Sequence, residues 1–258
     1  MPTADLRDQL SHVLTADDPT DGLWDLVDTG RAEEIVPELP ALALEQDPIH
    51  KHKDVLAHTI AVTANTRADL TLRLSALFHD IGKPKTRRYD DSGVTFRHHE
   101  AVGAKMARKR LTALEYPEAT VNDVSELVRL SGRFKGYAAG WSDSAVRRYA
   151  RDAGHLLGLL NELVRSDCTT RNERKRLELH HHVDDLEERI IRLAAEDRRK
   201  AERPLIDGKA VMDRYGIGPG PEIGQALTFL LELKRAEPDL DLEATGARLD
   251  EWWNARGV

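Results

Sequence analysis

Apolar residues recur at helical spacing along most of the chain, and this pattern predicts an all-α protein. Residues 85–97 are polar and include a Ser-Gly pair, which indicates a loop or small hairpin. No alternation of strands and helices is visible. The expected helices are a short acidic one ending at Gly30, then 54–66, 68–81, 99–114, 118–130, 143–152, 155–168 and 171–201, and three short ones within 205–256.

Breaks in this pattern divide the chain into residues 1–48, 49–203 and 204–258. These segments carry net charges of −10, +7 and −4, within a total of −7. An acidic total argues against a protein that coats nucleic acid nonspecifically. The basic middle segment is compatible with a phosphate-bearing ligand or, alternatively, with a solvated helical surface.

Composition narrows the class of protein further. The chain has 258 residues, of which 40% are hydrophobic and 32% charged, enough to bury a core. Cys168 is its one cysteine, which excludes an intrachain disulfide and a cysteine-based zinc site. We find neither a signal peptide nor an apolar run near the ~20 residues of a membrane span. We therefore expect a cytoplasmic protein without a membrane partner.

A histidine-aspartate pair interrupts the apolar helix that ends in LSALFHDIGK. His79 and Asp80 would be costly to bury there unless a partner such as a metal compensates them. His58 lies on the preceding helix, and Asp167 interrupts a later Leu-rich helix. Each of these histidines alone could be an ordinary core or surface residue. Together they indicate a mixed nitrogen and oxygen site, suited to Mn, Fe, Co, Ni or Mg.

Two further residues are placed near this cluster by helical spacing. Lys83 lies three residues after Asp80, so it should face the same side and hold a phosphate oxygen. Asp54 lies four residues before His58 and either orients the imidazole ring or caps the helix.

The set H…HD…D, with HDIGK around the pair, resembles the HD-domain metal-dependent phosphohydrolases. The resemblance implies that His58, His79, Asp80 and Asp167 bind a divalent metal. This metal would activate water for attack on phosphorus, with Asp80 or a neighbour handling the proton. It also makes His99, in FRHHEAVGA, a candidate for a further metal or substrate contact; the alternative is a surface histidine at a helix cap.

A second resemblance covers nearly the whole chain. Similarity to the C-terminal body of bacterial, actinobacterial-type CCA-adding tRNA nucleotidyltransferases is carried by HKHKDVLAHTIAV, ALFHDIGKPKTR, FRHHEAVGA, WSDSAVRRYARDAG, RSDCTTRN and LIDGKAVMDRYGIGPGPEIGQAL. It implies neck-like helices in 1–48, the HD domain and a long helix in 49–203, and a helical tail in 204–258. The sequence shows no Gly-rich catalytic head, so we do not expect nucleotide addition by this chain alone.

The candidate site departs from that family in LVRLSGRFKGY. Related enzymes typically carry histidines where this chain has Ser131 and Lys135, and those histidines would serve a second metal. The departure favours a one-metal site and leaves Arg133 and Lys135 as candidates for binding substrate phosphate. It is also compatible with a degraded hydrolase that keeps only its metal-binding core.

Two other segments are candidates for phosphate or RNA contact. Arg147, Arg148 and Arg151 share a helix and form either part of a phosphate track or a solvated basic face. Gly218 and Gly220 precede a predicted helix start at Pro221, where backbone N–H groups either hold a phosphate or simply make a helix-helix turn.

These observations favour a metal-dependent phosphohydrolase or phosphodiesterase acting on a nucleotide, a 2′,3′-cyclic phosphate or an RNA 3′ end. The alternative is a non-catalytic body that binds tRNA, working with a separate nucleotidyltransferase in tRNA 3′-end processing. A third interpretation is a paralogue with neither role, against which the complete ligand set argues.

Overall fold

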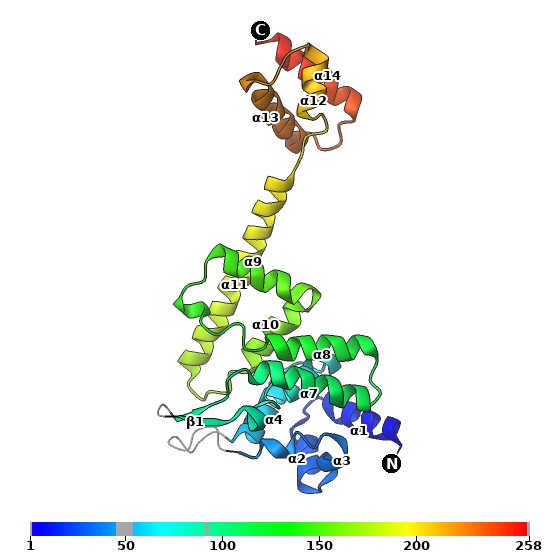
Figure 1. Cartoon of the computed structure of the whole chain (residues 1–258), viewed down its shortest axis with the longest axis vertical. Coiled ribbons are helices and arrows are strands. Elements are labelled where there is room, and N and C mark those ends of the chain that lie inside the picture. The colour runs from blue at the N-terminus through cyan, green and yellow to red at the C-terminus, as the bar shows by residue number, and fades with distance from the viewer. Residues whose placement is uncertain (1, 45–53, 91–92, 257–258) are drawn as a thin grey trace. The chain divides into compact units, whose positions relative to one another are not determined.

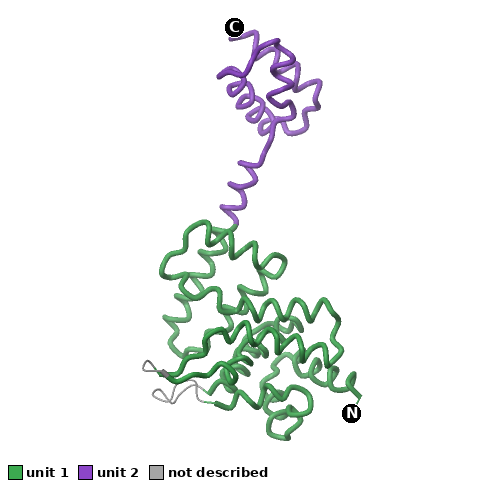
Figure 2. The backbone as a smooth tube through the Cα atoms, in the orientation of Figure 1, with its two compact units in different colours: residues 1–190 green, residues 191–258 purple. Residues whose placement is uncertain are grey.

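The computed structural model describes residues 2–44, 54–90 and 93–256, which are largely helical (Figure 1). The chain forms two compact units, Met1–Ile190 and Ile191–Val258 (Figure 2). The expected all-α fold is confirmed. The three-part division at residues 48 and 203 stays a prediction.

The elements follow one another along the chain as α1 (Thr3–Thr15), α2 (Thr20–Asp28), α3 (Arg31–Ile35), η1 (Pro40–Leu42), α4 (Val55–Asn65), α5 (Leu70–Phe78), α6 (Lys83–Thr86), β1 (Arg88–Asp90), β2 (Gly93–Thr95), α7 (His99–Ala113), α8 (Glu118–Leu130), η2 (Tyr137–Ala139), α9 (Asp143–Ala153), η3 (Gly154–Leu156), α10 (Leu157–Ser166), α11 (Glu173–Ala201), α12 (Gly208–Tyr215), α13 (Pro221–Ala236) and α14 (Leu242–Asn254).

Helices α4 and α5 carry the apolar segments around the histidine-aspartate pair. Each is capped by an aspartate: Asp54 accepts hydrogen bonds from two first-turn N–H groups of α4, and Asp69 accepts one from the N–H of Leu72 in α5. The predicted helix 68–81 is too long at its end, because α5 stops at Phe78 and the chain turns before α6. This turn places His79 and Asp80 at the end of a helix rather than within one.

The core of the first unit joins the N-terminal helices to the helices that follow. Leu10 and Leu14 of α1 belong to the same buried cluster as Phe78 of α5 and Val128 of α8. At about 25 cal/mol per Å² of buried apolar surface, such a cluster supplies the main favourable free energy of folding. It holds α5 against helices on several sides, so the residues at its end have a fixed support.

Arg73 is a charged side chain within this apolar environment. It lies on α5, is 1% exposed, and its guanidinium donates to the backbone carbonyls of Leu14, Ala16, Asp17 and Thr66. Burial lowers the pKa of Arg73, and the nearby Asp18 and Asp17 partly offset that effect. The residue ties α5 to the chain segment that follows α1.

Gly82 allows the turn after α5 to lie directly against α7. A Cβ atom at this position would lie 2.1 Å from the carbonyl oxygen of His99 and 2.8 Å from the amide nitrogen of Gly103. Both distances are shorter than any normal contact, so a side chain is excluded there. The backbone of His99 is therefore held close to the turn that carries Asp80.

A two-stranded hairpin follows α6. Strands β1 and β2 are antiparallel, with Arg88 opposite Thr95 and Tyr89 opposite Val94. The small hairpin expected within residues 85–97 is thereby confirmed.

The second unit has its own small core, to which aromatic residues contribute. Tyr215 stacks on Trp253 with ring centroids 4.1 Å apart, and Phe229 stacks on Trp252 at 4.9 Å. Helix α13 begins at Pro221, as expected. Helix α11 crosses the division between the units, and its Leu177 is 50% exposed.

Among the described residues, no helix combines the length and apolar character needed to cross a membrane. The longest of them, α11, is rich in charged side chains.

Candidate metal centre

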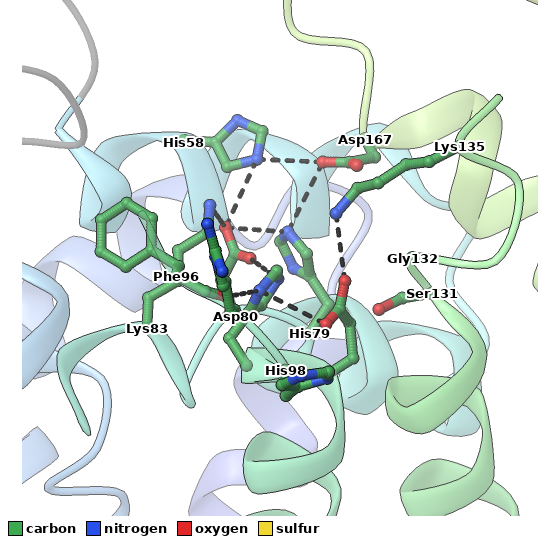
Figure 3. A pocket seen from close by; sticks show the side chains of 13 residues that line it. His58, His79, Asp80, Lys83, Phe96, His98, Ser131, Gly132, Lys135 and Asp167 are labelled. Atoms are coloured by element: carbon green, nitrogen blue, oxygen red, sulfur yellow. Dashed lines mark hydrogen bonds and ion pairs between the residues drawn. The ribbon is translucent and has the colours of Figure 1, made fainter. Parts of the chain in front are cut away.

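Three helices bring the predicted ligand residues together. His58 comes from the first turn of α4, His79 follows the end of α5, and Asp167 follows the end of α10. One ligand atom from each lies within 4.8 Å of the others, and the side chains converge with Asp80 (Figure 3). The juxtaposition expected from the sequence is present, while the ligand role of these residues stays a prediction.

His79 has one satisfied and one unsatisfied ring nitrogen. Its Nδ1 donates to the carbonyl oxygen of Ala76 at 2.7 Å, which fixes the ring and leaves Nε2 as the free nitrogen. Nε2 is buried and makes no hydrogen bond within the described part of the chain. It lies 3.2 Å from Asp80 Oδ2 and 3.5 Å from Asp167 Oδ1. A metal among these atoms would satisfy it, so the residues present fit a divalent cation.

His58 is oriented by a residue outside its own helix. Its Nδ1 lies 2.9 Å from the hydroxyl oxygen of Thr169, and its Nε2 lies 3.0 Å from Asp167 Oδ1 and 3.8 Å from Asp80 Oδ2. Of the two roles open to Asp54, the structure shows the helix cap. Thr169 occupies the orienting position instead.

Asp80 lies at the centre of the cluster. Lys83 Nζ donates to its Oδ2 at 2.6 Å, and His99 Nε2 lies 3.4 Å from its Oδ1. His99 is fixed by donation from its Nδ1 to the carbonyl oxygen of Phe96 at 2.8 Å. Burial raises the pKa of the Asp80 carboxyl, but His79, His99 and Lys83 outweigh burial and hold that pKa well below its usual range.

The carboxylates of Asp80 and Asp167 favour a positive charge beside them, either a proton on His79 or a bound cation. Burial lowers the pKa of this imidazole, but the carboxylates of Asp80 and Asp167 outweigh burial and raise the pKa to about 10. Desolvation raises the pKa of the Asp167 carboxyl, but its interactions with His58 and His79 outweigh desolvation and lower that pKa overall. Two ionised carboxylates beside a buried imidazole suit a bound cation.

The cluster forms one wall of a cavity of about 520 Å³. On another wall, Lys135 Nζ donates to Glu100 Oε1 at 3.0 Å, and the Lys135 side chain is 69% exposed. The Ser131 hydroxyl donates to the carbonyl oxygen of Val128 at 2.9 Å. Neither Ser131 nor Lys135 contributes an imidazole nitrogen, so this wall has charge-bearing groups but lacks histidine ligands.

Sequence reasoning missed Thr169 and Glu100. Thr169 stands two residues after Asp167, in DCTT, and Glu100 directly follows His99, so adjacency to a candidate ligand was the available signal. Which of these neighbouring polar side chains faces the site depends on the residue at which α10 ends and the residue at which α7 begins.

None of the other predicted phosphate-binding residues is among those that line this cavity. Arg133 pairs with Asp152 at 2.9 Å, and none of the arginines 147, 148 and 151 on α9 lines the cavity. Gly218 and Gly220 belong to the second unit, where Gly220 directly precedes α13. Their proposed contacts with phosphate or RNA stay predictions.

Comparison with known families matches residues 55–214 to the HD domain. Among characterised proteins, the chain is similar to the A-adding tRNA nucleotidyltransferase of Deinococcus radiodurans, with 32% identity over 89% of this chain and 54% of that protein. It is also similar to the CC-adding tRNA nucleotidyltransferase of Thermus thermophilus, with 32% identity over 88% of this chain and 51% of that protein. The chain thus spans about half the length of these relatives.

Proposed function

The chain belongs to the HD-domain family, and from this premise we propose that it is a metal-dependent phosphohydrolase. Its proposed substrate is a phosphodiester or phosphomonoester on a nucleotide, a 2′,3′-cyclic phosphate or an RNA 3′ end. The observation that carries the proposal is the buried His79 Nε2, which lacks a hydrogen-bond partner among the described residues and faces two carboxylates.

The proposed metal ligands are His58, His79, Asp80 and Asp167, with His99 as a further candidate. Manganese, nickel, cobalt, iron and magnesium all suit such a mixed set. A divalent cation held there would supply Lewis acidity toward a phosphoryl oxygen and lower the pKa of water. Positions 131 and 135 carry serine and lysine in place of the histidines that would serve a second metal, so one ion is proposed.

The chain's own residues would position the phosphate and receive the proton. Lys83 Nζ, which is buried against Asp80, and Lys135 Nζ, which is exposed above the cavity, are proposed to hold phosphate oxygens. Asp80, whose carboxylate is ionised, is proposed to accept the proton of the attacking water.

The test combines elemental analysis of the purified protein with phosphodiester hydrolysis in Mn²⁺, Ni²⁺, Co²⁺ and Mg²⁺. We expect near-stoichiometric metal and metal-dependent turnover that is lost in Asp80→Ala. The matched control is Asp25→Ala, which removes an exposed aspartate of α2 and should behave as wild type. Unchanged turnover in metal-stripped Asp80→Ala would contradict the proposal.

A second proposed function is tRNA binding without catalysis, together with a separately encoded nucleotidyltransferase. It is favoured by the absence of histidine at Ser131 and Lys135 and by similarity to two enzymes named for tRNA. The proposed contacts are Arg133, Lys135, Arg147, Arg148, Arg151, Gly218 and Gly220. This function predicts tRNA binding that weakens steeply with salt and survives Asp80→Ala. Lack of binding at low salt would overturn it.

A further inference from the structure

A second cavity of about 430 Å³ adjoins the metal centre. We call it the side cavity. Four residues line both cavities: His58, Ser131, Lys135 and Asp167. Because two of these are proposed metal ligands, a molecule whose phosphate reaches the metal centre can place its next chemical group in the side cavity.

The walls of the side cavity differ in chemistry from those of the metal centre. Phe134 and Tyr137 come from the segment after α8, Val164 from α10, and Leu179 and His182 from α11. Phe134 and Tyr137 stack with ring centroids 5.3 Å apart, and His182 lies edge-on to Tyr137 at 6.4 Å. Flat aromatic and aliphatic walls suit a planar ring and do not suit an isolated phosphate.

Beyond the four shared residues, the polar side chains on these walls are of the kind that orients a ring or sugar: Tyr137, Cys168, Thr169, Thr170 and His182. The Thr170 hydroxyl oxygen accepts a hydrogen bond from the amide of Asn172 at 3.2 Å, so its own proton is available to a ligand. The thiol of Cys168 also lines the side cavity. An apolar pocket with a small number of hydrogen-bonding groups is the usual form of a small-molecule site.

We propose that the side cavity receives the nucleoside part of a substrate whose phosphate lies at the metal centre. The volume falls within the range of about 300–1,000 Å³ that small-molecule sites occupy. Lys135, at the boundary of the two cavities, supplies a cation where the phosphate joins the nucleoside. This inference rests on the proposed function and deepens it by assigning the place where the nucleoside part of the substrate binds.

The experiment is calorimetric titration of the metal-loaded full chain with inorganic phosphate and with adenosine 3′-monophosphate. Wild type should bind the nucleotide at least tenfold more tightly than inorganic phosphate. Ala138→Trp places a large ring in the side cavity from an exposed position of η2, and should remove at least tenfold of nucleotide affinity while leaving phosphate affinity within twofold. Ala139→Trp, at the next and equally exposed position, does not line the cavity and serves as the control.

A second blocking variant comes from another element. Leu179→Trp on α11 should reproduce the selective loss, and unchanged thermal unfolding midpoints would show that all three variants fold. Equal affinity of wild type for phosphate and nucleotide, or unchanged nucleotide affinity in both blocking variants, would overturn the side-cavity proposal. By contrast, a protein that binds neither metal nor inorganic phosphate would overturn the proposed hydrolase, so the two failures are distinguishable.

Discussion

Two buried polar side chains, Arg73 of α5 and His79 directly after that helix, differ in how their hydrogen-bonding groups are used. Arg73 donates to four backbone carbonyls, and its charge is enclosed by acceptors. His79, just beyond the other end of the same helix, uses one ring nitrogen and leaves the other buried without a hydrogen-bond partner among the described residues. Both residues are at most 4% exposed, so burial alone does not separate them.

The difference indicates what each residue contributes. A buried charge with complete partners contributes to folding, because removing it leaves several acceptors unsatisfied. A buried nitrogen that lacks a partner contributes little in that way, and it points to a ligand. The expected effects of substitution therefore fall on different measurements, and four variants test this separation.

Arg73→Met should have the largest effect, and it should be on stability. The carbonyls of Leu14, Ala16, Asp17 and Thr66 would lose their donors, at roughly 1–3 kcal/mol for each buried group left unsatisfied. We expect the free energy of unfolding in urea to fall by about 3 kcal/mol or more. Metal content of the folded fraction should stay unchanged, and a parallel loss of metal would contradict the separation.

His79→Ala should have the opposite profile. Loss of a ligand should weaken metal binding by more than about 100-fold, the upper range for loss of an outer hydrogen-bond partner of a ligand. The metal-free protein should lose less unfolding free energy than Arg73→Met does, because the substitution removes one hydrogen bond, from Nδ1 to the Ala76 carbonyl, whereas Arg73→Met removes the donors of four carbonyls. His12→Ala, on an exposed position of α1, is the matched control. A larger stability loss than in Arg73→Met would refute the comparison.

Thr169→Val should weaken metal binding less than His79→Ala does. It removes the oxygen that lies 2.9 Å from His58 Nδ1 while keeping the shape of the side chain. Metal affinity should fall by about 10-fold, as for other residues that orient a ligand histidine, and Thr169→Ser should restore it. Competition with a fluorescent chelator measures both variants. Equal affinity in the valine and serine variants would show that the hydroxyl does not position His58.

Lys135→Ala should have the smallest effect on stability. Its pair with Glu100 is 69% exposed on the lysine side, and exposed ion pairs contribute about 0–1 kcal/mol. Metal content should also be unchanged, whereas inorganic phosphate should bind the metal-loaded protein several-fold less tightly. Phosphate affinity equal to wild type would remove Lys135 from the proposed phosphate site.

The sequence predicted the helices and the approach of His58 to His79, because both depend on apolar periodicity and on a short connection. Asp167, 109 residues from His58, was grouped with them because it interrupts an apolar stripe and because of the family resemblance. Lys83 was also placed correctly, since three residues separate it from Asp80 within one turn of chain. The family resemblance supplied the proposed role of these residues, which periodicity alone would not identify.

Long-range partners were not predictable in the same way. Thr169 reaches His58 across 111 residues of sequence, and Arg73 reaches Leu14 across 59, so neither contact leaves a local pattern. The side cavity is assembled from the segment after α8, from α10 and from α11, and its volume follows from how these elements pack. Such features depend on tertiary packing rather than on spacing along the chain.

Gly82 fixes the distance between the turn after α5 and helix α7 beside the candidate metal centre. Since a Cβ atom there would lie 2.1 Å from the His99 carbonyl oxygen, the two backbone segments are in direct contact and leave no room for a side chain. Any larger residue would push α7 outward and carry His99 and Glu100 with it. A survey of substitutions would therefore rank this position among the least tolerant of the chain, although it offers no functional group. A residue without a functional group can thus be essential to a site because it sets the distance between two backbone segments.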